Sequence, residues 1–192
     1  MSRINEKFTE LKRKNEKALI AYIMMGFPNE KATITTVRGL VKGGADIIEL
    51  GFPFSDPLAD GPVIQNASTV SLEKGTNISK FFNLVKKIRK ETDIPLVLMT
   101  YTNILYHRGY EKFISEAKSA GIDGFILPDM SIEESKEYTK SAENKADTIF
   151  LISPNTSKTR IEKIAKTSTG FLYLVAVFGT TGVKTSIKNY TL

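Results

Sequence analysis

The fold of this chain is decided by one stretch of its sequence, Asp46-Ile47-Ile48-Glu49-Leu50-Gly51-Phe52-Pro53-Phe54-Ser55-Asp56-Pro57-Leu58-Ala59-Asp60-Gly61-Pro62. The stretch opens as a short apolar strand with Glu49 near its carboxyl end. Side chains alternate along a strand, so Ile47 and Glu49 share one face while Ile48 and Leu50 share the other. In a closed parallel sheet one face points at the axis. A carboxylate at the carboxyl end of such a strand is well placed for chemistry.

The residues after the strand form a stiff, sharply turned loop. Three prolines and two aspartates lie between Pro53 and Pro62, which excludes both helix and strand. Asp56, directly before a proline, is typical of a residue that caps a turn. Asp60 follows Glu49 by eleven positions, and the two carboxylates form a candidate acid–base pair. Glu49 between Ile and Leu must be buried or line a site, because buried carboxylates are rare unless paired or functional.

The fifteen residues Ile-Glu-Leu-Gly-Phe-Pro-Phe-Ser-Asp-Pro-Leu-Ala-Asp-Gly-Pro closely resemble the signature of the alpha subunit of tryptophan synthase. The motif has few free positions, and the similarity extends along most of the chain. The resemblance implies a (β/α)8 TIM barrel. It also implies the cleavage of indole-3-glycerol phosphate to indole and glyceraldehyde 3-phosphate, a retro-aldol step of tryptophan biosynthesis.

Composition places the chain in a reducing compartment and leaves few classes of site open. The 192 residues are one domain's worth, without a linker or a change in composition, so we expect a single barrel domain over residues 1–192. There is no Cys and only one His, which leaves no thiolate or His-based metal site. No long apolar run or signal peptide is present. We therefore expect a soluble, cytoplasmic protein that does not contact a membrane.

The net charge of +6 does not indicate a nucleic-acid partner. The Lys and Arg residues are spread along helical stretches with Glu between them, and no aromatic stacking platform accompanies them. We interpret them as solvated helix faces that also favour anionic substrates.

Apolar runs alternate with helical patterns along the whole chain. Such a pattern requires a parallel sheet with both faces covered. The capping-box sequence Ser131-Ile132-Glu133-Glu134 predicts a helix that starts there. The other predicted helices begin near residues 4, 30, 63, 78, 110 and 157, and the six predicted strands span residues 19–25, 46–50, 95–101, 123–127, 148–152 and 171–175.

Two topologies fit this alternation, an open doubly wound sheet and an incomplete barrel. No G-x-G-x-x-G sequence follows the first strand, which argues against a dinucleotide-binding sheet. Polar residues lie at the carboxyl ends of several strands, and their convergence on one rim favours the barrel: Glu49, Tyr101 with Asn103, Asp129 and Tyr173.

The predicted barrel is incomplete. A (β/α)8 barrel has eight strand–helix units and typically about 250 residues, whereas six units are predicted here. By the family pattern strands seven and eight are missing, so we expect a fragment of a longer protein. The loops after those strands commonly build the phosphate site.

The resemblance implies a role for several residues. By position Glu49 corresponds to the proton shuttle and Asp60 to the group that stabilises the indole nitrogen. Among apolar neighbours Glu49 should have a raised pKa, whereas Asp60, on a wetter loop, should stay ionised. The other matching positions are substrate-binding: Tyr22, Met99, Ile126, Tyr173, Thr181 and Gly182.

The family also implies a partner and the absence of a cofactor in this chain. The partner is the tryptophan synthase beta subunit in an alpha2-beta2 assembly, and pyridoxal phosphate is expected only in that subunit. The loop around Pro53 and Asp56, with part of residues 101–106, would face it. His107 is expected on that surface or near a helix start.

Two alternatives remain open from the sequence. One is another phosphate-ligand enzyme on the same scaffold, such as a phosphosugar isomerase or an aldolase. A Schiff-base aldolase would need a Lys on a predicted strand, and none of the six strands contains one. The other is a non-catalytic module that docks to and activates a synthase partner.

Overall fold

The computed structural model describes residues 1–57 and 60–175 of the chain. In this part strands and helices follow one another in an alternating order, as the sequence predicts. The elements are α1 (Arg3–Lys14), β1 (Ile20–Met24), α2 (Glu30–Lys42), β2 (Ile47–Gly51), α3 (Pro62–Glu73), α4 (Ile78–Arg89), β3 (Leu96–Met99), α5 (Thr102–Arg108), α6 (Tyr110–Ala120), β4 (Gly124–Ile126), α7 (Lys136–Ala142), β5 (Asp147–Ile152), α8 (Lys158–Thr167) and β6 (Leu172–Leu174).

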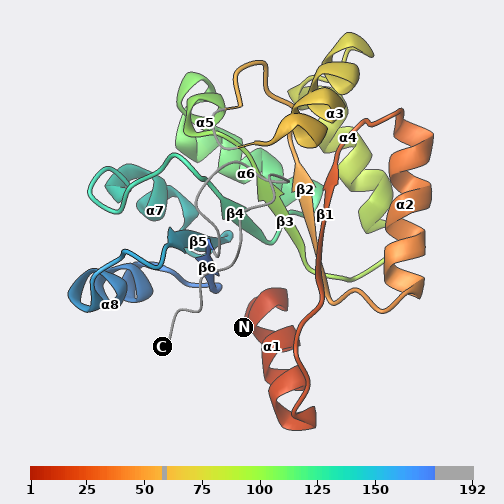
Figure 1. The fold of residues 1–192 in the computed structure, drawn as a ribbon. Coiled ribbons are helices and arrows are strands. Elements are labelled where there is room, and N and C mark those ends of the chain that lie inside the picture. Colours follow the sequence, from red (N-terminus) through yellow and green to blue (C-terminus); the bar gives the residue numbers. More distant parts are fainter. Residues whose placement is uncertain (58–59, 176–192) are drawn as a thin grey trace.

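The strands form one parallel sheet in which spatial order equals sequence order, from β1 to β6. A doubly wound sheet reverses its order at a switch point, so this topology is that of a barrel. The sheet curls, and most helices lie on its outer side (Figure 1). The predicted fold class, a TIM barrel represented by about six strand–helix units, is confirmed. None of the helices in the described residues is long and apolar enough to cross a membrane.

The helices begin where short polar side chains can bind their first free backbone N–H groups. Ser2, Asn29, Asn77 and Ser157 each accept a hydrogen bond from the backbone N–H three residues further on. Such caps stabilise a helix by about 1 kcal/mol each. Serine and asparagine at these positions therefore fix where the covering helices begin, and with them the entry of each following strand.

Two apolar clusters lie on opposite faces of the sheet. The outer core lies between the sheet and its helices, and joins Leu50 and Leu98 to Phe81 and Phe113. The inner core lies on the concave face and contains Ile4, Ile47, Val97, Ile126 and Ile149. The alternation of strand side chains thus separates Leu50 from its neighbour Glu49, which points to the concave side.

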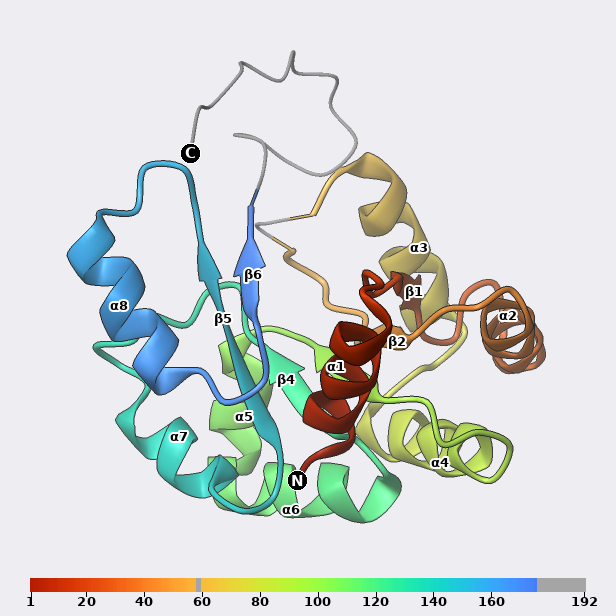
Figure 2. The ribbon, with the colours of Figure 1, turned by 90° about the horizontal axis from the view of Figure 1, so that it is seen from below.

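Helix α1 lies at the amino ends of the strands, inside the curve of the sheet (Figure 2). Ile4 belongs to the inner core, and Phe8 packs there with its ring centroid 5.7 Å from that of Phe171. Gly124 leaves room for this contact, because a Cβ there would lie 2.9 Å from Cδ1 of Ile4. The amphipathic first helix of the sequence therefore covers the amino end of the concave face.

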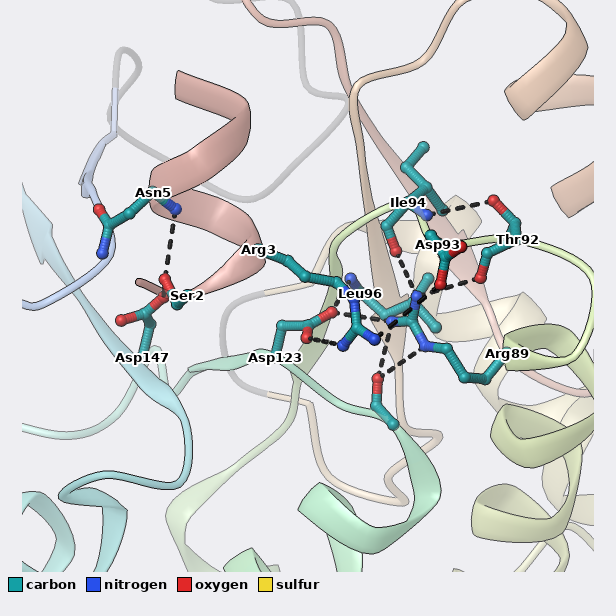
Figure 3. A network of polar contacts seen from close by, with 11 residues as sticks. Ser2, Arg3, Asn5, Arg89, Thr92, Asp93, Ile94, Leu96, Asp123 and Asp147 are labelled. Carbon is teal, nitrogen blue, oxygen red and sulfur yellow. Dashed lines mark hydrogen bonds and ion pairs between the residues drawn. The ribbon is translucent and has the colours of Figure 1, made fainter. Parts of the chain in front are cut away.

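A polar network joins α1 to the amino ends of β3 and β4 (Figure 3). Asp123 is buried, and its carboxylate accepts hydrogen bonds from Arg89, Arg3 and the Leu96 N–H at 2.8, 2.9 and 2.9 Å. Arg89 also donates to the carbonyls of Thr92, Ile94 and Gly121. The network satisfies backbone groups that the sheet leaves unpaired at this end.

Two details of the structure differ from the predictions. The predicted helix start at Ser131 is wrong, since α7 begins at Lys136. The Ser131 hydroxyl does bind Glu134 as in a capping box, but the residues that follow form a turn instead of the first turn of a helix. The short helix α5 was not predicted, because its seven residues show too little periodicity to be recognised.

Tyr138 offers a test of the outer core. Its side chain is almost fully buried, and its hydroxyl has no hydrogen-bond partner among the described residues. A buried polar group without a partner costs about 1–3 kcal/mol. We expect Tyr138→Phe to leave the free energy of unfolding unchanged or to raise it by about 1 kcal/mol. Urea unfolding measures this, and a clear loss of stability would show that the hydroxyl has a partner in solution.

Candidate active site

Glu49 lies on the concave face of β2 and is 6% exposed. It pairs in register with Tyr22 of β1 and Val97 of β3. Burial raises the pKa of Glu49 to about 7, as its apolar surroundings in the sequence predict. A carboxyl with this pKa exchanges a proton readily at neutral pH, so it can serve as both acid and base.

Asp60 is held beside the strand ends by the loop and by α3. The Ser68 hydroxyl of α3 accepts a hydrogen bond from the Phe54 N–H and donates one to the Phe54 carbonyl, at 2.8 and 2.9 Å. The Gln65 amide donates to the carbonyl of Asp60 at 2.8 Å. The loop is therefore tied to the first two turns of a helix, which gives its carboxylate a defined position.

The carboxylate of Asp60 has a partner that the predicted set of site residues did not include. The Tyr101 hydroxyl donates a hydrogen bond to Oδ2 of Asp60 at 3.3 Å, and the Tyr101 ring packs on Phe54 with centroids 5.0 Å apart. The alternation that turns Val97 and Met99 inward also turns residue 101 inward. This was the available signal, although the loop that carries Phe54 could not be placed from sequence.

The expectation that Asp60 lies in a wetter setting is wrong. Asp60 is 8% exposed, and burial raises the pKa of its carboxyl above the usual value, while the hydrogen bond from Tyr101 lowers it in part. Both carboxyls of the candidate pair are thus buried, but only Asp60 has a printed side-chain donor that favours its ionised form. The expected division into a proton carrier and a fixed anion is supported by this hydrogen bond and by no difference in wetness.

The Tyr101 hydrogen bond leads to a prediction about Asp60. We expect Tyr101→Phe to raise the pKa of Asp60 further, because the bond stabilises the carboxylate and opposes the effect of burial. NMR titration of isotope-labelled aspartate measures the change. Tyr106→Phe is the control, because this exposed tyrosine of α5 should leave the titration of Asp60 unaltered. An unchanged or lowered pKa of Asp60 in Tyr101→Phe would contradict the prediction.

The remaining predicted site residues fall into two groups. Tyr22, Met99, Ile126 and Tyr173 come from four strands, and the last three contribute to the inner core. Tyr22 and Tyr173 are close enough to Glu49 for its charge to raise the pKa of both phenols, although burial is the larger cause. Thr181 and Gly182 lie outside the described residues.

Other polar residues near the strand ends have structural positions. The Asp129 carboxylate accepts hydrogen bonds from the backbone N–H and the hydroxyl of Thr102, and so binds the first turn of α5. Asn103 and His107 are exposed residues of α5. His107 thus belongs to the surface, as expected. No three His, Asp or Glu side chains of the described residues lie together as a metal site would require.

These features define a class of protein. A curled parallel sheet whose strands follow in sequence order, with two buried carboxyls at the carboxyl ends of its strands, is typical of enzymes built on (β/α)8 barrels. The comparisons below then identify the family.

Residues 8–191 match the family described as tryptophan synthase alpha chain. The alpha chain of Methanosarcina barkeri is 48% identical over 190 residues, which cover 98% of this chain and 72% of that protein. The alpha chain of Geotalea uraniireducens is 46% identical over 190 residues, covering 98% of this chain and 71% of that protein. The chain belongs to the tryptophan synthase alpha chain family, which implies a lyase reaction in tryptophan biosynthesis.

Solved structures agree with this assignment. Tryptophan synthase subunit alpha from Legionella pneumophila superposes with a TM-score of 0.88 at 37% identity, over 96% of this chain and 70% of that chain. A structure of the tryptophan synthase α2β2 complex from Pyrococcus furiosus gives a TM-score of 0.78 at 40% identity, over 82% of this chain and 64% of that chain. The signature around Glu49 and Asp60 thus identified the family correctly.

Proposed function

We propose that this chain cleaves indole-3-glycerol phosphate to indole and glyceraldehyde 3-phosphate by a retro-aldol reaction. The observation that carries the proposal is the pair of buried carboxyls, Glu49 with its pKa near 7 and Asp60 with its tyrosine donor, on the concave face of a barrel of this family. Family membership supports the substrate class.

The reaction makes three demands that two carboxyls can meet. C3 of the indole must gain a proton, the indole N–H needs a nearby anion, and a hydroxyl of the glycerol chain must lose its proton as the carbonyl forms. Glu49 gives a proton to C3 and later takes the hydroxyl proton, because a carboxyl with a pKa near 7 is populated in both forms. Asp60 accepts the hydrogen bond of the indole nitrogen.

Four side chains would surround the substrate. Tyr22, Met99 and Ile126 line the indole end, and Tyr173 lies beside the reacting part of the chain. Their common inward orientation on neighbouring strands supports this assignment. Thr181 and Gly182 are assigned by family position alone, as residues that close over the site and bind the phosphate.

The proposed reaction needs no cofactor in this chain, since both proton transfers have a carboxyl to perform them. We assign pyridoxal phosphate to a partner, the beta chain, in an α2β2 assembly such as the Pyrococcus furiosus complex. The loop around Pro53 and Asp56 and the exposed Tyr106 of α5 are on the side that would meet it. We place the protein in the cytoplasm, the compartment of its substrate.

The test is the release of indole and glyceraldehyde 3-phosphate from indole-3-glycerol phosphate by the full-length protein, alone and with a beta chain. We expect the two products in equal amounts and a faster reaction in the complex. Binding to the beta chain without product release would favour a docking module instead.

A further inference from the structure

Tyr22 is the polar group of the concave face whose position the proposed roles leave unexplained. It lies on β1 opposite Glu49 of β2 in the register of the parallel pair. Its neighbours along the same face are apolar, as Ile20 shows by packing on the inner core. A phenylalanine would fill this position as well, so the hydroxyl requires a reason of its own.

The hydroxyl has a defined place because of Gly51. A Cβ on Gly51 would lie 2.1 Å from the phenol oxygen of Tyr22 and 2.6 Å from its Cζ. No other side chain fits there unless the ring moves. The glycine is thus needed for the close approach of the ring, since its own backbone is not left-handed. The ring leans along the strand towards the carboxyl end, and the hydroxyl lies over Gly51, two positions beyond Glu49.

The hydroxyl is a neutral hydrogen-bond donor near both carboxyls. Burial raises the pKa of Tyr22, and the charges of Asp60 and Glu49 raise it further, in that order. The phenol therefore keeps its proton throughout the neutral range. Within residues 1–57 and 60–175 the Tyr22 hydroxyl donates to no protein group, so a donor between the two carboxyls is available to a bound molecule.

We propose that the Tyr22 hydroxyl, held over Gly51, positions the substrate by donating a hydrogen bond to the glycerol-chain hydroxyl beside the bond that breaks. The inference rests on the proposed function. Asp60 faces the indole nitrogen and Glu49 the reacting carbons, so a donor close to both carboxyls lies beside the carbon that joins ring and chain. The hydrogen-bonding group on that carbon is its hydroxyl.

The hydrogen bond strengthens as the reaction proceeds. The hydroxyl proton goes to Glu49, the oxygen becomes the aldehyde carbonyl, and the electron pair of the broken carbon–carbon bond returns to the indole ring. Negative charge builds on the oxygen along this path, and a donor already in place stabilises it without reorganisation. Tyr22 is a positioning residue in the substrate complex and stabilises the transition state by the same contact.

Tyr22→Phe tests the proposal, because it keeps the ring over Gly51 and removes one oxygen. In the full-length protein we expect kcat/KM for indole-3-glycerol phosphate to fall about tenfold, the effect of one hydrogen bond to a partly charged group. Binding of indole-3-propanol phosphate, whose chain lacks the hydroxyls, should stay within about twofold if one contact is lost. Tyr138→Phe, which removes a hydroxyl from the outer core, should change neither quantity.

The outcomes separate the two proposals. If the unaltered protein releases no indole, the proposed function fails and this inference fails with it. If it releases indole and Tyr22→Phe keeps the same kcat/KM, the function stands and the role of the hydroxyl is wrong. Equal weakening of the substrate and of the unhydroxylated analogue would also overturn the inference, because it would show a packing effect.

A second pair of variants tests the fit of ring and glycine independently of activity. Gly51→Ala should lower the Tm, because its methyl group strikes the phenol. In the Tyr22→Leu background, where the outer ring atoms are gone, the same substitution should lower the Tm far less. An equal loss in both backgrounds would show that Gly51 does not hold the ring in place.

Discussion

Glu49→Gln should reduce indole release by at least about 100-fold, the usual contribution of a general acid–base group. Glutamine keeps the shape of the side chain but can neither give nor take a proton. The measurement is steady-state indole production by the full-length protein at saturating indole-3-glycerol phosphate. Gln65→Glu is no substitute test, because α3 carries Gln65 on the loop side of the site. Substantial indole release by Glu49→Gln would refute the assignment.

The same substitution should have a separate, pH-dependent effect on stability. The pKa of Glu49 is about 7 in the fold against 4.5 for the model value. As pH rises from 4.5 to 7, the unfolded chain ionises first, so the fold loses stability. A difference of this size corresponds to about 3 kcal/mol. Glutamine does not titrate and removes this loss.

Urea unfolding at pH 4.5 and pH 8.5 therefore distinguishes a chemical defect from a folding defect. Relative to the unaltered protein, we expect Glu49→Gln to gain up to about 3 kcal/mol between these two pH values. Lower activity together with this gain would mark Glu49 as a group kept in a costly setting for its chemistry. A loss of stability at pH 8.5 relative to pH 4.5 would contradict the raised pKa.

Asp123→Ala should be the most destabilising single change outside the site, at about 3–5 kcal/mol. The carboxylate is buried, and its removal leaves the half-buried Arg89 guanidinium and the Leu96 N–H without this acceptor. Desolvation already lowers the pKa of Arg89, which shows how much the cation depends on nearby acceptors. Urea unfolding at neutral pH gives the measurement.

Arg3→Met is the matched control for this network. Arg3 also donates to Asp123, but its side chain is 42% exposed, so water replaces the lost interaction. We expect it to cost less than about 1 kcal/mol. If Arg3→Met and Asp123→Ala cost the same, burial would not be the reason for the strength of the network.

The strands and most helices could be predicted from sequence because their patterns are local. The continuous apolar runs give the parallel sheet, and the alternation in Ile47–Gly51 puts Glu49 on the concave face. The start of α7 could not be predicted, since the capping box at Ser131 is satisfied within a turn. Local polar bonds of this kind do not reveal whether a helix continues.

The site was predictable only as far as strand positions determine it. Glu49, Met99 and Ile126 follow from alternation, whereas the burial of Asp60 depends on a loop that packs on Tyr101 across a large gap in sequence. Neither the Tyr101 donor nor the space at Gly51 has a signature in the local pattern. Both arise from contacts between elements that meet only in the folded chain.

The separation of the outer core from the concave face also bears on how such a protein can diversify. The larger apolar cluster lies between sheet and helices, and touches none of the side chains assigned to the reaction except through the strands themselves. Exchanges on the inner face therefore sample new substrates at a modest thermodynamic penalty. A chain organised in this way can acquire another chemistry through mutation of a few inward positions and inherit its architecture unchanged.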